Sequence, residues 1–192
     1  KIAAAINEYK ITSDYAKTAI EKYPTQYDYF MDYGMYERYL GHYDAAEEAW
    51  TQAIQIESGY FLAYAYRAGL YDERNMFPQA LADYKKVVEL NPEYYFAHES
   101  LGVLALHEKQ WSTARASFEE CYKKNPANVS YPLMVTYCYY MEGNDIEARN
   151  FSNQALRVMD RNTIEYTMLR VYHDKAASAM RISSRRRSLS TL

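Results

Sequence analysis

The feature that most constrains what this chain can fold into is a period of 34 residues. At this spacing, residues of matching size or ring character recur in six columns over four successive segments. So many matching columns predict a repeated structural unit. Three columns are small, namely Ala46, Ala80, Ala114 and Ala148; Ala53, Val87, Cys121 and Ala155; and Gly34, Ala68, Gly102 and Thr136. Two are aromatic except at their last member, namely Trp50, Tyr84, Phe118 and Ser152, and Tyr43, Phe77, Trp111 and Asp145; the sixth holds Pro24, Pro92 and Pro126, with Ser58 and Asp160 in the same register.

Each unit is predicted to be a pair of helices. In one unit the first helix covers residues 96–108, where apolar residues recur at helical spacing, at Ala97, Leu101, Leu104 and Ala105. A polar break follows at 109–110, and Ser112 is predicted to cap the second helix. In an earlier unit, Asp44 with Glu47 three residues later gives a similar start signal.

Prolines and small residues support the same helix pairs. Pro78 fits the first turn of a helix, where no N–H donor is missed, and Pro92 and Pro126 fall just past helix ends. Small residues in facing columns, such as Gly102 and Ala114, allow paired helices to approach closely while the aromatic column fills the space beside them. A larger side chain at Ala114 is expected to overpack that contact.

Composition agrees with a helical class. Six Gly and five Pro among 192 residues are too few for a chain of many strands and turns. No run of 18 apolar residues occurs, so no membrane span is predicted. The 23 Tyr side chains combine an apolar ring with a hydroxyl, which favours amphipathic faces over a purely apolar core.

Together, the helix–turn–helix period and its small, aromatic and proline columns resemble the tetratricopeptide repeat (TPR) family. The resemblance implies an all-α fold, a right-handed superhelical solenoid of antiparallel helix pairs. It assigns residues 27–60, 61–94 and 95–128 to three units. It assigns 129–162 to a divergent unit, which keeps Ala148 and Ala155 but lacks the aromatic and proline signatures.

The two ends are predicted to differ from a full unit. Residues 1–24 fit a partial repeat, in which 1–8 end a first helix and 9–24 form a second. Residues 163–181 fit a capping helix with a polar outer face, and 182–192 a flexible basic tail. Since the chain starts at Lys1 without Met or a signal-like segment, we interpret it as a fragment or a processed chain. The compartment therefore stays open, with the cytoplasm favoured over a bacterial periplasm or envelope.

The candidate chemical groups favour structural roles. None of the four His forms a zinc-binding pair one helical turn apart, so we predict no metal and no cofactor. Cys121 occupies a small column and is predicted to be a buried hydrophobe; a disulfide with Cys138 stays open. Adjacent acids such as Glu119 and Glu120 do not face each other on a helix. With no Gly-rich phosphate loop and no G-x-S-x-G motif, the chain is predicted not to be an enzyme.

The family resemblance places the binding surface on the concave face, on the first helix of each unit. We predict an apolar groove there with adaptable Met side chains, for a helix or peptide segment with basic flanks. Only one basic residue falls in the set, which argues against the grip on a C-terminal carboxylate that chaperone-binding members of the family use. Packing between helices is the alternative role. The predicted partner-binding residues are Met31, Met35, Arg38, Tyr39, Leu62, Asp72, Glu73, Phe96, Glu99, Val103, Leu106, His107, Tyr137, Tyr140 and Met141.

Charge is distributed unevenly along the chain. Of the 22 Lys and Arg residues 17 precede Lys175, as do all 25 Asp and Glu residues, so an acidic body is followed by a basic end. The acidic body argues against nucleic acid as a partner. A solvated tail is favoured over a kinase site at Ser188. Two other functions stay open: an accessory arm of a larger enzyme or export complex, and a carrier for an apolar small ligand; assembly into oligomers also stays open.

Overall fold

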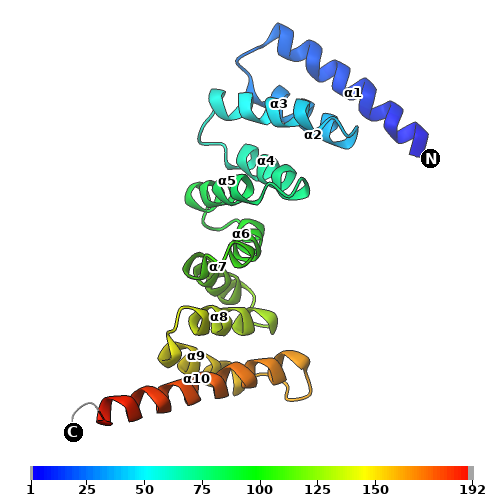
Figure 1. The fold of residues 1–192 in the computed structure, drawn as a ribbon. Coiled ribbons are helices and arrows are strands. Elements are labelled where there is room, and N and C mark those ends of the chain that lie inside the picture. Colours follow the sequence, from blue (N-terminus) through cyan, green and yellow to red (C-terminus); the bar gives the residue numbers. More distant parts are fainter. Residues whose placement is uncertain (1, 190–192) are drawn as a thin grey trace. The chain divides into compact units, whose positions relative to one another are not determined.

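The computed structural model describes the backbone of residues 2–189 and the side chains of residues 4–182. Over this described range the regular secondary structure is entirely helical, with turns between the helices and no strand (Figure 1). The all-α prediction is confirmed. The helices are α1 (Ile2–Lys22), α2 (Tyr27–Tyr39), α3 (Tyr43–Ile56), α4 (Phe61–Glu73), α5 (Phe77–Leu90), α6 (Tyr95–His107), α7 (Trp111–Lys124), α8 (Ser130–Met141), α9 (Asp145–Leu156) and α10 (Ile164–Leu189).

The chain divides into two compact units, residues 1–97 and 98–192. In the first unit each helix from α1 to α5 packs against the next one along the chain. In the second, α7, α8, α9 and α10 pack in the same sequential way, and α10 also contacts α8. Sequential contacts of this kind are typical of a repeat protein, in which each repeat touches only its neighbours.

The core of the first unit forms where the predicted columns meet. Trp50 on α3 is almost fully buried, and its indole Nε1–H donates to the carbonyl oxygen of Met31 on α2 at 3.3 Å. A Cβ atom added at Gly34 would lie 2.6 Å from the same indole ring. Glycine is therefore required there because α2 and α3 approach each other closely. Ala46 and Ala53 complete the buried face of α3.

The second unit uses the same arrangement with different residues. A Cβ at Gly102 would lie 2.8 Å from the ring of Phe118, so the small column again faces the aromatic one. In the divergent repeat Ser152 replaces the ring, and its hydroxyl donates to the carbonyl oxygen of Ala148 at 2.7 Å. Thr136 takes the place of glycine, and its buried hydroxyl has no hydrogen-bond partner within the described residues.

The helix starts differ from the predicted caps. Helices α3 and α7 begin at the aromatic residues Tyr43 and Trp111, and their N-cap residues make no side-chain hydrogen bond. Ser112 and Asp44 therefore lie inside the helices, and their prediction as caps is wrong. Pro78 lies in the first turn of α5, as predicted.

A left-handed residue recurs every 34 positions and explains these starts. Gly41, Asn75, Lys109 and Gly143 all have positive φ, from 56° to 81°. Each follows the first helix of a repeat; at the first of them, the N–H of His42 donates back to the Glu37 carbonyl at 2.8 Å. This Schellman turn sets where the second helix begins.

The two ends of the chain also differ from prediction. Residues 1–8 and 9–24 were predicted as parts of two helices, but α1 is continuous from Ile2 to Lys22. At the other end α10 extends to Leu189, so residues 182–189 are helical and not a flexible tail. The last three residues of the predicted tail, 190–192, lie outside the described residues. A polar run alone does not end a helix, and this one contains no Gly or Pro to stop it.

Candidate functional site

The predicted partner-binding residues of the first unit divide into buried and exposed groups. Met31 is only 7% exposed and belongs to the core. Met35 and Leu62 are partly buried against that same core. The prediction of a partner-facing Met31 is therefore wrong. Its position in the repeat points inward, because Leu133, three repeats later in the same register, is also buried.

Two aromatic residues of the predicted set in the first unit reach solvent. Tyr39 at the end of α2 is 54% exposed, and its ring stacks on Tyr9 of α1 with centroids 5.1 Å apart. Phe96 in the first turn of α6 is 66% exposed. Exposed aromatic rings of this size are the usual anchors of a protein interface.

Two of the three charged residues predicted in the first unit, Arg38 and Glu73, pair with each other. The guanidinium of Arg38 contacts the carboxylate of Glu73 through two of its nitrogens, Nε and Nη2. The distance from Nε to Oε2 is 3.1 Å. The hydrogen bonds that Arg38 donates to Glu73 are the main cause that raises the pKa of Arg38. The only basic residue of the predicted set is therefore engaged within the protein, while Asp72 beside the pair is exposed.

In the second unit Val103 and Met141 are the exposed apolar members of the predicted set. Val103 on α6 is 55% exposed and Met141 at the end of α8 is 40% exposed. Leu106 is half-buried. His107 is exposed, and its Nδ1 lies 3.0 Å from Glu108 Oε1. Glu99 accepts a hydrogen bond from the Tyr131 hydroxyl at 2.9 Å, so it serves packing between α6 and α8.

The two predicted tyrosines of α8 lie in an aromatic cluster. The ring centroids of Tyr137 and Tyr140 lie 5.3 Å and 5.7 Å from that of Tyr172 on α10. Burial is the main cause that raises the pKa of Tyr172. The ammonium of Lys175 lies over Tyr172 at 5.3 Å and Tyr140 at 6.0 Å from the ring centroids, a cation–π arrangement. Sequence reasoning missed Tyr172 and Lys175, because the 34-residue register carries Tyr137 and Tyr140 to other residues of α10.

An open hollow of about 540 Å³ lies beside this cluster along α10. The hollow is lined by exposed apolar side chains together with one acidic and one basic side chain. Such a hollow suits a side chain of a docked segment better than an enclosed small molecule. Its lining residues are Tyr140, Val171, Asp174, Lys175, Ser178, Ala179 and Ile182.

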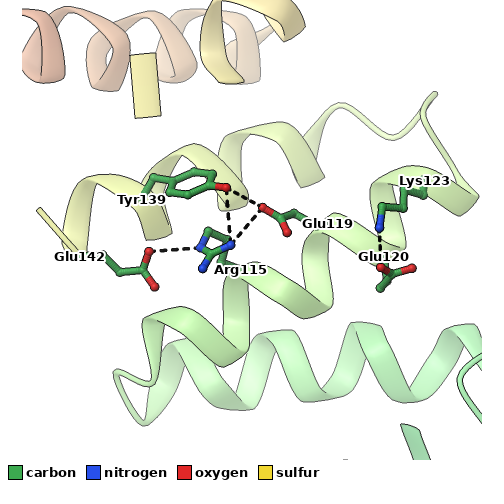
Figure 2. A network of polar contacts seen from close by, with 6 residues as sticks. All are labelled: Arg115, Glu119, Glu120, Lys123, Tyr139 and Glu142. Carbon is green, nitrogen blue, oxygen red and sulfur yellow. Dashed lines mark hydrogen bonds and ion pairs between the residues drawn. The ribbon is translucent and has the colours of Figure 1, made fainter. Parts of the chain in front are cut away.

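Polar contacts between α7 and α8 are structural. Figure 2 shows Arg115 between Glu142, 3.1 Å away, and Glu119, 3.3 Å away. The Tyr139 hydroxyl donates to Glu119 at 2.9 Å, and the guanidinium carbon lies 4.6 Å from the centre of the tyrosine ring. This network joins helices of successive repeats, and all four side chains are occupied by one another.

The cysteines are free and buried, as predicted for Cys121. Burial raises the pKa of both Cys121 and Cys138 to about 12, so both thiols are neutral near pH 7 and poor nucleophiles. Within the described part of the chain, no three His, Cys, Asp or Glu side chains come together in a way that could hold a metal ion. Among the described helices, none is both long enough and apolar enough to span a bilayer.

Comparison with known proteins identifies the repeat. A family model described as tetratricopeptide repeat matches residues 68–129. Over 96 residues the chain is 26% identical to Hsp70-Hsp90 organizing protein 3 of Arabidopsis thaliana, a match that covers 50% of this chain and 17% of that protein. This chain thus spans less than a fifth of that relative's length.

Two solved structures share the fold. YrrB, described as a TPR protein with an unusual peptide-binding site, matches with a TM-score of 0.67 and 15% identity, over 83% of this chain and 82% of that chain. A tetratricopeptide repeat protein from Parabacteroides merdae ATCC 43184 matches with a TM-score of 0.62 and 25% identity, over 91% and 70% of the two chains. These likenesses confirm a TPR-type solenoid fold.

Proposed function

Because this chain is a tetratricopeptide repeat protein, we propose that it is a non-catalytic scaffold that binds an apolar helix or peptide segment of a partner protein. The observation that carries the proposal is a contrast between two sets of residues. The columns that pair the helices are buried, with Ala46, Ala80 and Ala114 fully inaccessible. On the first helices, by contrast, Phe96 and Val103 leave more than half of an apolar side chain in water. Exposed apolar anchors that packing does not require are what a binding surface needs.

Each unit has its own set of such anchors. In the first unit they are Tyr39 and Phe96, and in the second Val103 and Met141. A single concave groove that joins both units stays a prediction. Binding affinity is expected to depend on these few anchors, because most contacts in an interface contribute little.

The relatives support an interaction role without naming a partner. By their names, the Arabidopsis relative organizes Hsp70 and Hsp90, and YrrB has a peptide-binding site. For this chain the engaged Arg38 favours an apolar segment over a carboxylate as the main recognised group. Buried neutral thiols at Cys121 and Cys138 are consistent with a non-catalytic role.

The test uses two substitutions on exposed positions. We expect Val103→Glu with Met141→Glu to reduce partner recovery in quantitative affinity capture at least ~10-fold, because each places a charge where an apolar side chain must be buried. Val158→Glu is the matched control, since that side chain is 76% exposed in the turn after α9 and belongs to no predicted face. Circular dichroism should give the same helicity for all variants. Equal recovery by the double variant and the control would contradict the proposal.

A further inference from the structure

A ladder of aromatic rings connects the starts of α2, α4 and α6 within the first unit. Its members, called the aromatic ladder below, are Tyr27, Tyr60, Phe61, Tyr94 and Phe96. Ring centroids lie 4.7 Å apart for Tyr27 and Tyr60, 6.5 Å for Tyr60 and Phe61, 5.1 Å for Phe61 and Tyr94, and 6.0 Å for Tyr94 and Phe96. These distances are those of edge-to-face and tilted aromatic contacts. Each ring thus contacts the next, up to the exposed Phe96.

The repeat itself does not require these rings. Four of its rings use two neighbouring positions of the 34-residue register, occupied by Tyr60 and Phe61 in one repeat, and Phe96 lies at a third. Two repeats later the same positions hold Asn128 and Val129, and the helix pair α8–α9 forms all the same. Helix pairing therefore does not explain the ladder. Its open end, Phe96, is the second most exposed aromatic side chain of the described residues, at 66% after Tyr15 at 73%.

Two carboxylates lie at the other end of the ladder. Asp28 and Asp32 are one helical turn apart on α2, and the charges of both act on the Tyr60 hydroxyl, whose pKa is raised chiefly by burial. Burial, and then the charge of Asp28, raise the pKa of Asp32. No described Lys, Arg or His forms an ion pair with either of them. Like charges one turn apart destabilise a helix slightly, so a cation placed between them would be favourable.

We propose that the aromatic ladder docks an extended peptide segment whose Lys or Arg side chain lies between Asp28 and Asp32, and whose apolar residue covers Phe96. This deepens the proposed function and rests on it, because it names the chemistry and the direction of the bound segment in the first unit. A guanidinium or ammonium group suits this end of the ladder for two reasons. The carboxylates form ion pairs with it, and the faces of the Tyr27 and Tyr60 rings attract it. The remaining rings offer an apolar track to a chain without regular structure.

The probes are three fluorescent dodecamer peptides with one shared apolar centre. They carry two arginines, two glutamines or two glutamates at one end, and binding to the full chain is measured by fluorescence anisotropy. We expect the arginine peptide to bind about tenfold more tightly than the glutamine peptide, the sum of one exposed ion pair and one cation–π contact. The glutamate peptide should bind most weakly, and added salt should narrow all the differences.

Two variants separate the ends of the site. Asp28→Asn with Asp32→Asn should remove the preference for arginine and leave the affinity of the glutamine peptide unchanged. Phe96→Ala should weaken all three peptides by a similar factor. The control, Glu21→Gln with Glu48→Gln, changes the net charge equally at exposed positions on α1 and α3, so it isolates non-specific attraction.

The outcomes distinguish this inference from the function on which it rests. If the wild-type chain binds the arginine and glutamine peptides equally, or if the aspartate variant keeps the preference, the inference is wrong while peptide binding stands. If the chain binds none of the three peptides, peptide binding by the first unit fails and the inference fails with it.

Discussion

Two helix junctions, α3–α4 in the first unit and α7–α8 in the second, each contain an ion pair at the same two positions of the repeat. The acidic and the basic residue have exchanged places between the two junctions. In the first, Glu47 accepts from the Tyr71 hydroxyl at 2.9 Å and from Arg74 at 3.0 Å. In the second, an arginine, Arg115, takes the place of Glu47, and Glu142 takes that of Arg74 (Figure 2). Both pairs are 27 residues apart.

The difference shows what a repeat junction requires. The backbone brings these positions together, and the pair needs opposite charges but not a fixed order of them. Reversal has one consequence for the tyrosine: with arginine at position 115, Tyr139 donates to Glu119 instead. In the first unit the position of Glu119 is held by Thr51, which accepts from Arg67 at 2.9 Å. A tyrosine hydroxyl thus donates to a carboxylate at both junctions, but the carboxylate occupies a different position of the repeat in each.

The largest effect is expected from reversing one charge in the second junction. Arg115→Glu would put a third carboxylate beside Glu119 and Glu142, all of which are 20–27% exposed in the wild type. We expect a loss of about 3 kcal/mol in the free energy of unfolding, as for removal of one partner from a partly buried pair. Urea denaturation followed by circular dichroism measures it. A loss below about 0.5 kcal/mol would mean that solvent screens the network fully.

A charge exchange in the first junction tests whether order matters. Glu47→Arg alone should cost about 2 kcal/mol, because it faces Arg74 and leaves Tyr71 without its acceptor. Adding Arg74→Glu should restore more than half of that loss, and the coupling energy of the double-mutant cycle gives the worth of the pair. Thr51→Glu, which copies Glu119, should then recover most of the rest. Additive losses in the double variant would show that the two junctions are not interchangeable.

The small column is expected to tolerate little added volume, although the expected loss is smaller than for the charge changes. Gly34→Ala adds a Cβ that would lie 2.6 Å from Trp50, a ring that is 1% exposed and cannot move aside. We expect a net loss of about 1–2 kcal/mol, since overpacking exceeds the gain in helix propensity. Gly59→Ala is the control, because the nearest atom to that added Cβ belongs to a flexible side chain in a loop. An unchanged melting temperature for Gly34→Ala would mean that α2 and α3 separate at little cost.

The tyrosine hydroxyl gives a smaller, pH-dependent effect. Tyr71→Phe should cost about 1 kcal/mol at neutral pH through the lost hydrogen bond to Glu47. Burial, followed by that hydrogen bond, raises the pKa of Tyr71 to about 12. Since the folded pKa lies above the unfolded value of 10.0, the stability from this group is complete below pH 10 and declines as the pH rises towards 12. The wild type should therefore lose its advantage over the variant across that window in urea denaturation, and a constant difference would contradict this.

The turn before the second helix offers the smallest effect, and a stabilising one. Lys109 adopts a φ of 56°, where the first unit has Gly41 at 81°. Lys109→Gly should raise the free energy of unfolding by up to about 1 kcal/mol, because a side chain in the left-handed region is strained. Gly41→Ala should act in the opposite direction. A loss of stability for Lys109→Gly would show that the entropy of the unfolded chain outweighs the strain.

Much of the fold could be predicted from the sequence. The period placed the helix pairs, and the small columns and one of the two aromatic columns are buried, as at Ala46, Trp50 and Phe118, whereas Tyr43 of the other aromatic column is 43% exposed. The turn column of Gly41, Asn75, Lys109 and Gly143 was missed because lysine is not a usual left-handed residue. Its spacing of 34 residues was the available signal.

The candidate site could be predicted only in part. The register selected first-helix positions but could not separate the exposed Phe96 and Val103 from the buried Met31. It also could not show that Arg38 is paired with Glu73, 35 residues away. Such outcomes depend on how neighbouring helices cross, which side-chain identity does not determine.

The sequence by itself determined the repeat, its helix pairs and the residues that hold each pair together, because close packing admits only small side chains opposite rings such as Trp50 and Phe118. The tertiary structure alone decided which face residues remain in water and which charges meet, as in Glu47 with Arg74 and Arg115 with Glu142. The physical reason is that packing depends on side-chain volume, which a repeat shows as a column. An ion pair depends only on opposite signs at a contact, so the sequence pattern can be reversed while the contact remains.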